Sequence, residues 1–237
     1  MRLGIMQPYF FPWLGYFDLI NMVDEWIVFD TPQYERHHWV NRNCILHPTT
    51  GWQYITVPLR KHHRDTPINQ IQIAMETDWR ERILRQLQHY KREAPYYKQV
   101  IGFLEECFSA ASPSLSETNI LTFRKTCQRL GITTPIRVLS QMNLVLEGVI
   151  EGPGDWALEI SRAVGASEYI NARGGAALLK EDKFTAHNIK LTIQSFTNMI
   201  YPCGTYQFEP ALSIIDVMMW NSPEQIKYYL DTFRSGV

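Results

Sequence analysis

The first thirty residues contain two short apolar runs separated by a segment with helical spacing. Residues 2–6 and 25–29 are rich in β-prone side chains, and each run is followed by a polar residue, Gln7 or Asp30. From Trp13 onward, apolar side chains recur near every third or fourth position, which is typical of a helix. A strand, a helix and a strand in so short a stretch form a βαβ unit with parallel strands. The pattern therefore predicts an α/β fold with a mainly parallel, Rossmann-like sheet.

The rest of the chain alternates in the same way, with one helical interruption. Two β-prone runs within residues 43–57 flank a turn sequence, so we expect a hairpin there. Three consecutive helical segments occupy residues 78–131, the third capped by Ser116, and we predict that they form a helical subdomain within a single α/β domain over 1–237. Further strands are expected at 136–140, 168–171 and 189–195, and further helices at 155–164, 210–220 and after Ser222.

Charge and composition exclude several classes of protein for this chain. Lys and Arg total 23 against 24 Asp and Glu, so the net charge is −1, which excludes a nucleic-acid binder driven by electrostatics. No apolar window is long enough for a membrane span, and Pro8, Pro12 and Asp18 interrupt the first apolar run, unlike a signal peptide. The four cysteines form no CxxC pair. We therefore expect reduced thiols and a cytoplasmic location.

Two polar and aromatic blocks follow the first two strands. The first spans residues 7–20, where Gln7 and Tyr9 stand in a loop stiffened by prolines, and core filling by aromatic side chains is an equally good interpretation. The second spans residues 33–43 and offers hydrogen-bonding, stacking and anion-pairing groups in a short stretch. Its candidate substrate contacts are Gln33, Tyr34, Trp39, Asn41, Arg42 and Asn43. Because both blocks leave adjacent strands, we expect Gln7, Tyr9, Gln33 and Arg42 to line one cavity.

Histidine and cysteine supply the candidates for catalysis. His38 or His37 is suited to act as a general base, because imidazole titrates near neutral pH. Adjacent histidines on a strand point to opposite faces, and no second ligand pattern accompanies them, so we expect no metal site. Cys44 and Cys203 follow polar motifs and could act as nucleophiles, although burial is the more common state of a single cysteine.

The two blocks together resemble the WbqC-like protein family. The resemblance rests on QPYFFPWLGYFDLI at 7–20, VFD at 28–30, QYERHHWVNRN at 33–43 and ITVPL at 55–59, and weaker matches extend over nearly the whole chain. The sequence departs from the family pattern at His37-His38 and at Pro32. The block around Gly15 is also similar, more distantly, to the first unit of HIGH-type nucleotidyltransferases, with aromatic side chains in place of both histidines of that motif.

The resemblance implies a role in bacterial surface-polysaccharide or O-antigen biosynthesis. It suggests a transferase that attaches an acyl or aminoacyl group to the amine of a nucleotide-linked amino sugar. The donor would be an acyl thioester, carried by CoA or by an acyl carrier protein, and no other cofactor is implied with certainty. Two alternatives remain open: a nucleotide-dependent ligase or nucleotidyltransferase on the same fold, and a non-catalytic protein that binds a sugar nucleotide or a carrier protein.

Overall fold

Five parallel strands in the order β5-β2-β1-β6-β7 form the main sheet of the chain. The computed structural model describes residues 1–233. The strands are β1 (Arg2–Met6), β2 (Glu25–Val28), β5 (Ile136–Val138), β6 (Glu168–Ala172) and β7 (Lys190–Gln194). The helices that link them are α1 (Leu14–Met22), α5 (Pro153–Ala163) and α6 (Glu181–Ala186), with the short turns η3 (Leu139–Gln141) and η4 (Arg173–Leu178). The α/β class and the Rossmann-like parallel sheet are confirmed.

The strand order reverses beside β1. From β1 the chain proceeds to β2 and β5 on one side, and then returns to place β6 and β7 on the other side. The carboxyl ends of β1 and β6 therefore diverge into connections that leave in opposite directions. In open α/β sheets this reversal creates the crevice in which ligands bind.

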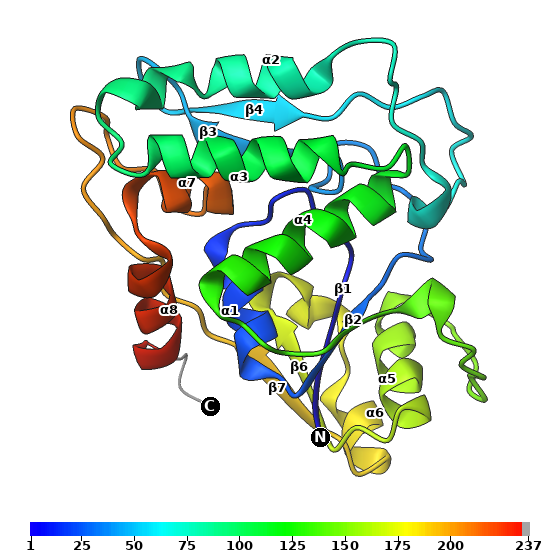
Figure 1. Cartoon of the computed structure of the whole chain (residues 1–237). Coiled ribbons are helices and arrows are strands. Elements are labelled where there is room, and N and C mark those ends of the chain that lie inside the picture. Colours follow the sequence, from blue (N-terminus) through cyan, green and yellow to red (C-terminus); the bar gives the residue numbers. More distant parts are fainter. Residues whose placement is uncertain (234–237) are drawn as a thin grey trace.

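A second layer lies beyond the carboxyl ends of the strands (Figure 1). It contains the antiparallel hairpin of β3 (Arg42–Leu46) and β4 (Trp52–Thr56), as expected, together with α2 (Trp79–Gln86), α3 (Tyr97–Ser109), α4 (Leu115–Leu130) and α7 (Ile214–Trp220). The turns η1 (Ile68–Gln70) and η2 (Gln88–Arg92) join these elements, and α8 (Pro223–Thr232) follows α7. The segment inserted between β2 and β5 thus includes the hairpin as well as the helices of 78–131. The division into one domain with a helical subdomain stays a prediction, and residues 234–237 lie outside the described part.

Most helix ends follow the expected capping signals. The Asp78 side chain accepts a hydrogen bond from the Glu81 N–H at the start of α2, and Ser222 forms a capping box with Gln225 at the start of α8. Helix α4 ends at Gly131, whose φ of 69° suits glycine. The expected cap at Ser116 is wrong. Ser114, directly after Pro113, caps α4 instead, because its side chain accepts from the N–H of Glu117.

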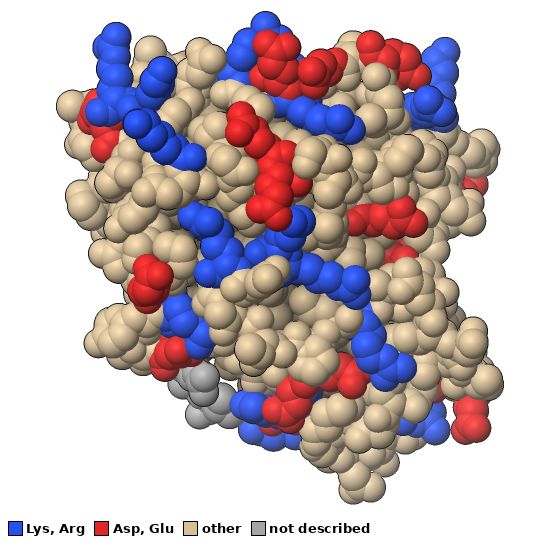
Figure 2. Space-filling view, viewed as in Figure 1, with Lys and Arg blue, Asp and Glu red and all other residues tan. Residues whose placement is uncertain are grey.

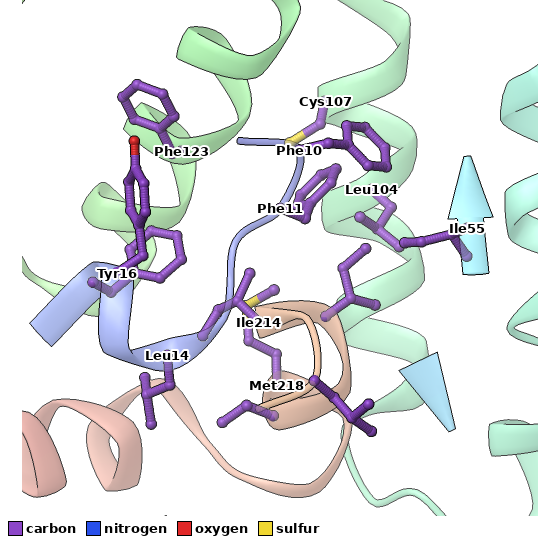
Figure 3. Close-up of a cluster of buried hydrophobic side chains, with 14 of the residues drawn as sticks. Phe10, Phe11, Leu14, Tyr16, Ile55, Leu104, Cys107, Phe123, Ile214 and Met218 are labelled. Atoms are coloured by element: carbon purple, nitrogen blue, oxygen red, sulfur yellow. The ribbon is translucent and has the colours of Figure 1, made fainter. Parts of the chain in front are cut away.

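The aromatic loop between β1 and α1 supplies much of the core between the two layers. Phe10 and Phe11 are fully buried and point toward side chains of α3 and α7 (Figure 3). The Phe11 ring meets Phe108 edge-on at 6.2 Å, and the Phe10 ring meets Trp79 at 6.4 Å. The core-filling interpretation of this loop is therefore correct for these two residues. Their burial fixes the loop at the carboxyl edge of the sheet.

The helices carry no feature of a membrane-spanning segment. The longest of them within residues 1–233, α4, has 16 residues, and none in that part of the chain has both the length and the apolar character that a bilayer crossing requires.

Candidate functional site: a cleft at the carboxyl edge of the sheet

A cavity of about 750 Å³ lies where the strand order reverses. One wall comes from the end of β1 and the loop that follows it, the second from the segment 35–43, and the third from the end of β6 with the start of α5. Predicted site residues that line it are Gln7, Tyr9, His38, Trp39 and Asn43; residues that sequence reasoning did not select include Asn171, Gly174, Gly175 and Gly154. The position and the mixed polar and apolar lining fit a small-molecule site.

Asn43 holds the loop wall of the cleft in place. Its amide group donates to the carbonyls of Phe10 and Phe11, both at 3.0 Å, and its oxygen accepts from the N–H of Cys44 at 2.8 Å. Phe11 has a φ of 39°, a left-handed conformation that a bulky side chain rarely adopts. The Ser213 hydroxyl also donates to the Phe11 carbonyl, at 2.8 Å. Asn43 is therefore a positioning residue, because its polar atoms already bind the backbone.

Asn171 presents the opposite situation on the β6 wall. Its side chain is only 6% exposed and lines the cavity, yet no hydrogen bond within residues 1–233 engages its amide group. Its amide atoms are not fully shielded from solvent, so the group is open to the cavity. The backbone around it leaves room for this side chain. A Cβ atom on Gly175 would lie 2.4 Å from the Asn171 Nδ2 atom, so Gly175 permits the observed orientation.

Aromatic side chains form the apolar surface of the cleft. The Tyr9 ring packs 5.8 Å from that of Tyr16, and burial raises the pKa of the Tyr9 hydroxyl, with Glu35 adding to the effect. Tyr9 is therefore a neutral hydrogen-bonding group at ordinary pH. Trp39 is 42% exposed, although its carbonyl is fixed by the N–H of Phe10 at 2.9 Å. An exposed indole at a cavity rim is suited to stack on a base or a sugar face.

His38 stands at the rim as part of an imidazole–carboxylate pair. Its Nε2 atom lies 3.0 Å from a carboxylate oxygen of Glu35, which also lines the cleft. A carboxylate on one ring nitrogen orients the imidazole and leaves the other nitrogen for a proton transfer. His37 lies elsewhere. Its backbone has a left-handed φ of 67°, and its side chain lines a different cavity.

The remaining residues of the second block lie outside the cleft. Asn41 accepts from the Tyr34 hydroxyl at 2.9 Å and donates to the carbonyl of Val57 at 3.0 Å, so both side chains are committed inside the fold. Arg42 lies over the ring of Tyr54 at 4.2 Å and lines the second cavity.

The expectation of one cavity for Gln7, Tyr9, Gln33 and Arg42 is therefore wrong. Gln33 donates to the carbonyl of Arg64 at 3.0 Å and lines neither cavity, whereas Gln7 and Tyr9 line the cleft. The physical reason is that the side chains of residues 34–43 are divided between two sides of the segment. Glu35, His38, Trp39 and Asn43 line the cleft, whereas Tyr34, Arg36, His37, Asn41 and Arg42 line the second cavity.

Several polar residues with structural roles escaped the sequence reasoning. Asn119 of α4 donates to the carbonyls of Pro8 and Val40 at 2.8 and 2.7 Å, and so links the loop after β1 to the segment 35–43, the first two walls of the cleft. Asp216 of α7 is fully buried and accepts from the hydroxyls of Tyr90 and Tyr201. Such long-range partners leave no local signal. Asn171 did carry one, since it stands at the end of a strand directly before Arg173-Gly174-Gly175.

The cysteines are poor candidates for a nucleophile. All four are buried, and desolvation raises the pKa of Cys44 to about 11 and that of Cys203 to about 12. The thiolate, which is the reactive form, is therefore scarce near neutral pH. Residues 1–233 also hold no group of three or more His, Cys, Asp or Glu side chains arranged to bind a metal ion.

The chain matches one protein family and one curated protein over most of its length. The WbqC-like protein family matches residues 7–228, which include every cleft residue named above. An uncharacterized protein of Mycobacterium tuberculosis, Rv1507c, is 28% identical over 232 residues, which cover 96% of this chain and 98% of that protein. No solved structure matches the chain.

Proposed function

The chain belongs to the WbqC-like protein family, and from that premise we propose that it is a transferase of surface-polysaccharide biosynthesis. In this proposal the cleft binds a nucleotide-linked amino sugar, and an acyl or aminoacyl group passes from a thioester donor to the amine of that sugar. The proposal keeps the biosynthetic setting that the sequence resemblance implies and assigns the acceptor to the cleft.

The observation that carries the proposal is the uncommitted amide of Asn171 inside the cleft. An amide that faces a cavity without a protein partner can bind a ligand that supplies both a donor and an acceptor, as a sugar hydroxyl or a base edge does. The aromatic rings of Tyr9 and Trp39 line the same cleft and offer a surface for stacking. Gly174 and Gly175 leave the backbone open to close approach by a ligand.

His38 is the proposed general base. The imidazole, oriented by Glu35, takes a proton from the acceptor amine while the amine nitrogen attacks the thioester carbonyl. The new C–N bond forms as the C–S bond breaks, and the proton passes to the departing thiolate. The products are an amide and a free thiol, so no oxidant, reductant or nucleotide hydrolysis is needed. Direct attack also agrees with the raised pKa values of the cysteines, which disfavour an acyl-cysteine intermediate.

One observation favours a second candidate, a non-catalytic protein that binds a nucleotide sugar. The side chains of His38 and Glu35 are 50% and 62% exposed, whereas a general base usually acts where water is excluded. In that case the pair would contact the ligand without moving a proton.

The test combines binding with turnover. Calorimetry with UDP-linked amino sugars should give a Kd that Asn171→Ala weakens about tenfold or more, because the loss of one buried hydrogen-bonding partner costs about 1–3 kcal/mol. Asn143→Ala, which removes an exposed amide outside the cleft, should bind normally. If no amino sugar nucleotide binds, or if both variants bind alike, the acceptor site is wrong.

Catalysis is tested on a matched pair of histidines. His38→Gln should lower the rate of N-acylation, followed by mass spectrometry with an acyl-CoA donor, by about 100-fold or more while leaving acceptor binding intact. The control is His63→Gln, because His63 also pairs with a carboxylate, Asp65 at 3.3 Å, but on an exposed loop away from the cleft. Normal binding with no acylation by the unmodified protein would favour the non-catalytic candidate.

A further inference from the structure

A second cavity, of about 770 Å³, lies on the other side of the segment 34–43. Its lining comes from three stretches of chain that the sequence separates: residues 34–42, the end of β4 with the residues that follow it, and the polar loop at 60–62. Residues 34–43 are therefore a wall shared by both cavities. His37 lines the second cavity and His38 lines the cleft, so adjacent residues face the two spaces.

The second cavity gathers positive charge. Four cationic side chains line it, and no carboxylate does; the cations are Arg36, Arg42, Arg60 and Lys61. Among the described ion pairs, only Arg60 of these four has an acidic partner, Glu76 at 3.5 Å. The whole chain has a net charge of −1, and Figure 2 shows acidic and basic side chains intermixed over one face of the molecule. A concave site lined by one sign of charge attracts ligands of the opposite sign.

Arg42 is held in position inside this cavity. Its guanidinium group donates to the carbonyl of His37 and lies over the Tyr54 ring at 4.2 Å. These contacts occupy one nitrogen and one face of the planar group. The Nη1 atom makes no described hydrogen bond and remains a donor for a ligand, whereas the Nε atom is buried and out of a ligand's reach. A guanidinium fixed in this way with donors to spare is suited to a phosphate or a carboxylate.

Several phosphates suit this cavity better than one carboxylate. Four cations from three separate stretches surround a space large enough for a nucleotide-sized ligand. A single carboxylate would leave most of that charge unpaired. The imidazole of His62, fixed by its ring contact with Tyr34 at 5.2 Å, adds an aromatic and polar surface to the same space.

We propose that this cavity is a separate site that binds the phosphate groups of a nucleotide carrier, such as the phosphorylated adenosine end of CoA. The inference of a phosphate site rests only on the charge and the size of the cavity. Its assignment to the thioester donor rests on the proposed transferase function. The shared wall then places the donor on one side of residues 34–43 and the acceptor cleft on the other.

The experiment measures binding of CoA to the full chain by calorimetry at two salt concentrations. CoA should bind, and pantetheine, which lacks the nucleotide and its phosphates, should bind at least tenfold more weakly. Affinity for CoA should fall as the salt concentration rises, because exposed charge pairs are screened. Equal binding of CoA and pantetheine, or no binding of CoA at all, would overturn the phosphate site.

Charge-matched double variants locate the site. Arg36→Gln with Lys61→Gln should weaken CoA binding by tenfold or more, since both side chains are exposed cations of the cavity. Arg92→Gln with Lys98→Gln removes the same charge from exposed positions outside it and should leave CoA binding unchanged. Equal losses in both pairs would mean nonspecific attraction and overturn the proposal.

The same variants separate this inference from the proposed function. If the cavity pair loses CoA binding and keeps binding of the amino sugar nucleotide, the two sites are distinct, as proposed. If it loses the sugar nucleotide instead, the cavity serves the acceptor and the donor assignment is wrong. If CoA binds as expected but no acyl transfer occurs, the phosphate site stands and the transferase proposal fails.

Discussion

Two asparagines on opposite walls of the cleft show how differently buried amides are used. Asn43 is 4% exposed, and its side-chain amide is hydrogen-bonded to the backbone of the loop after β1 and of its own strand, β3. Asn171 is 6% exposed, and its side-chain amide forms no hydrogen bond within the described residues. Burial alone therefore does not separate a structural polar residue from a candidate ligand contact. The hydrogen-bond partners do, because an amide that the protein leaves unused at a cavity is available to a ligand.

The largest expected effect comes from truncating each amide in turn. Asn43→Ala should lower the free energy of unfolding by about 2–4 kcal/mol, because it removes three hydrogen bonds and leaves the Cys44 N–H without an acceptor. Asn171→Ala should change it by less than about 1 kcal/mol, since no bond is lost. Urea denaturation of both variants measures the contrast. Equal destabilisation would show that Asn171 is structural and would end the comparison.

A second prediction concerns Asp216, a buried polar residue that, like Asn43, is hydrogen-bonded within the fold. Desolvation raises the pKa of this buried carboxyl from 3.8 to about 6, although the hydroxyls of Tyr90 and Tyr201 act in the opposite direction. Between these values the folded state holds a proton that the unfolded chain releases. The stability contributed by this protonation is therefore present at low pH and is lost as the pH rises toward 6.

The measurement compares the protein with Asp216→Asn, which keeps the shape but does not titrate. The stability advantage of Asp216 over Asn should be greatest near about pH 4 and should decrease by up to about 3 kcal/mol by about pH 7. Other titrating groups are common to both proteins and cancel in the difference. A difference that stays constant over this range, or one that grows with pH, would contradict the assignment.

The smallest expected effect comes from two neighbouring glycines beside Asn171, Gly174 and Gly175. Gly175→Ala places a Cβ atom 2.4 Å from the Asn171 Nδ2 atom, so the amide must turn away. We expect about a tenfold loss of sugar-nucleotide affinity, or about 1.4 kcal/mol, with little change in the fold. Gly174→Ala is the control, because its Cβ atom would meet nothing within 4 Å. Calorimetry measures the sugar-nucleotide affinity of both variants. Identical affinities would mean that the orientation of Asn171 does not affect binding.

The local pattern of the sequence predicted the strands and most of the helices, but not α6 (Glu181–Ala186). Alternation of apolar runs with helical spacing predicted all five strands of the sheet, and the turn at 47–51 predicted the hairpin. Capping residues predicted the starts of α2 and α8, because their hydrogen bonds join residues three apart. The start of α4 was misplaced by two residues because Ser114 and Ser116 are both good caps, and the chain direction after Pro113 selects the first.

The candidate site depended on contacts that no local pattern contains. Glu35 and Arg36 are adjacent in sequence and belong to similar polar surroundings, yet they line different cavities. Local polarity therefore predicted one cavity for Gln7 and Arg42, although the two residues line cavities on different sides of the segment 34–43. The same local polarity predicted substrate roles for Asn41 and Asn43, whose backbone partners, Val57 after β4 and the loop at 7–13, are brought to them only by the tertiary structure.

What the sequence by itself determined is the alternation of elements, because strand and helix periodicities are properties of neighbouring residues. What only the tertiary structure decided is the order in which strands pair and the side to which each polar group turns. Those choices come from packing between distant segments, such as Phe10 against α2 and Phe11 against α3, and from hydrogen bonds such as those of Asn119 to Pro8 and Val40. Asn171 became a candidate through the same physics, since its buried amide is the one that packing left without a partner among the cleft asparagines described here.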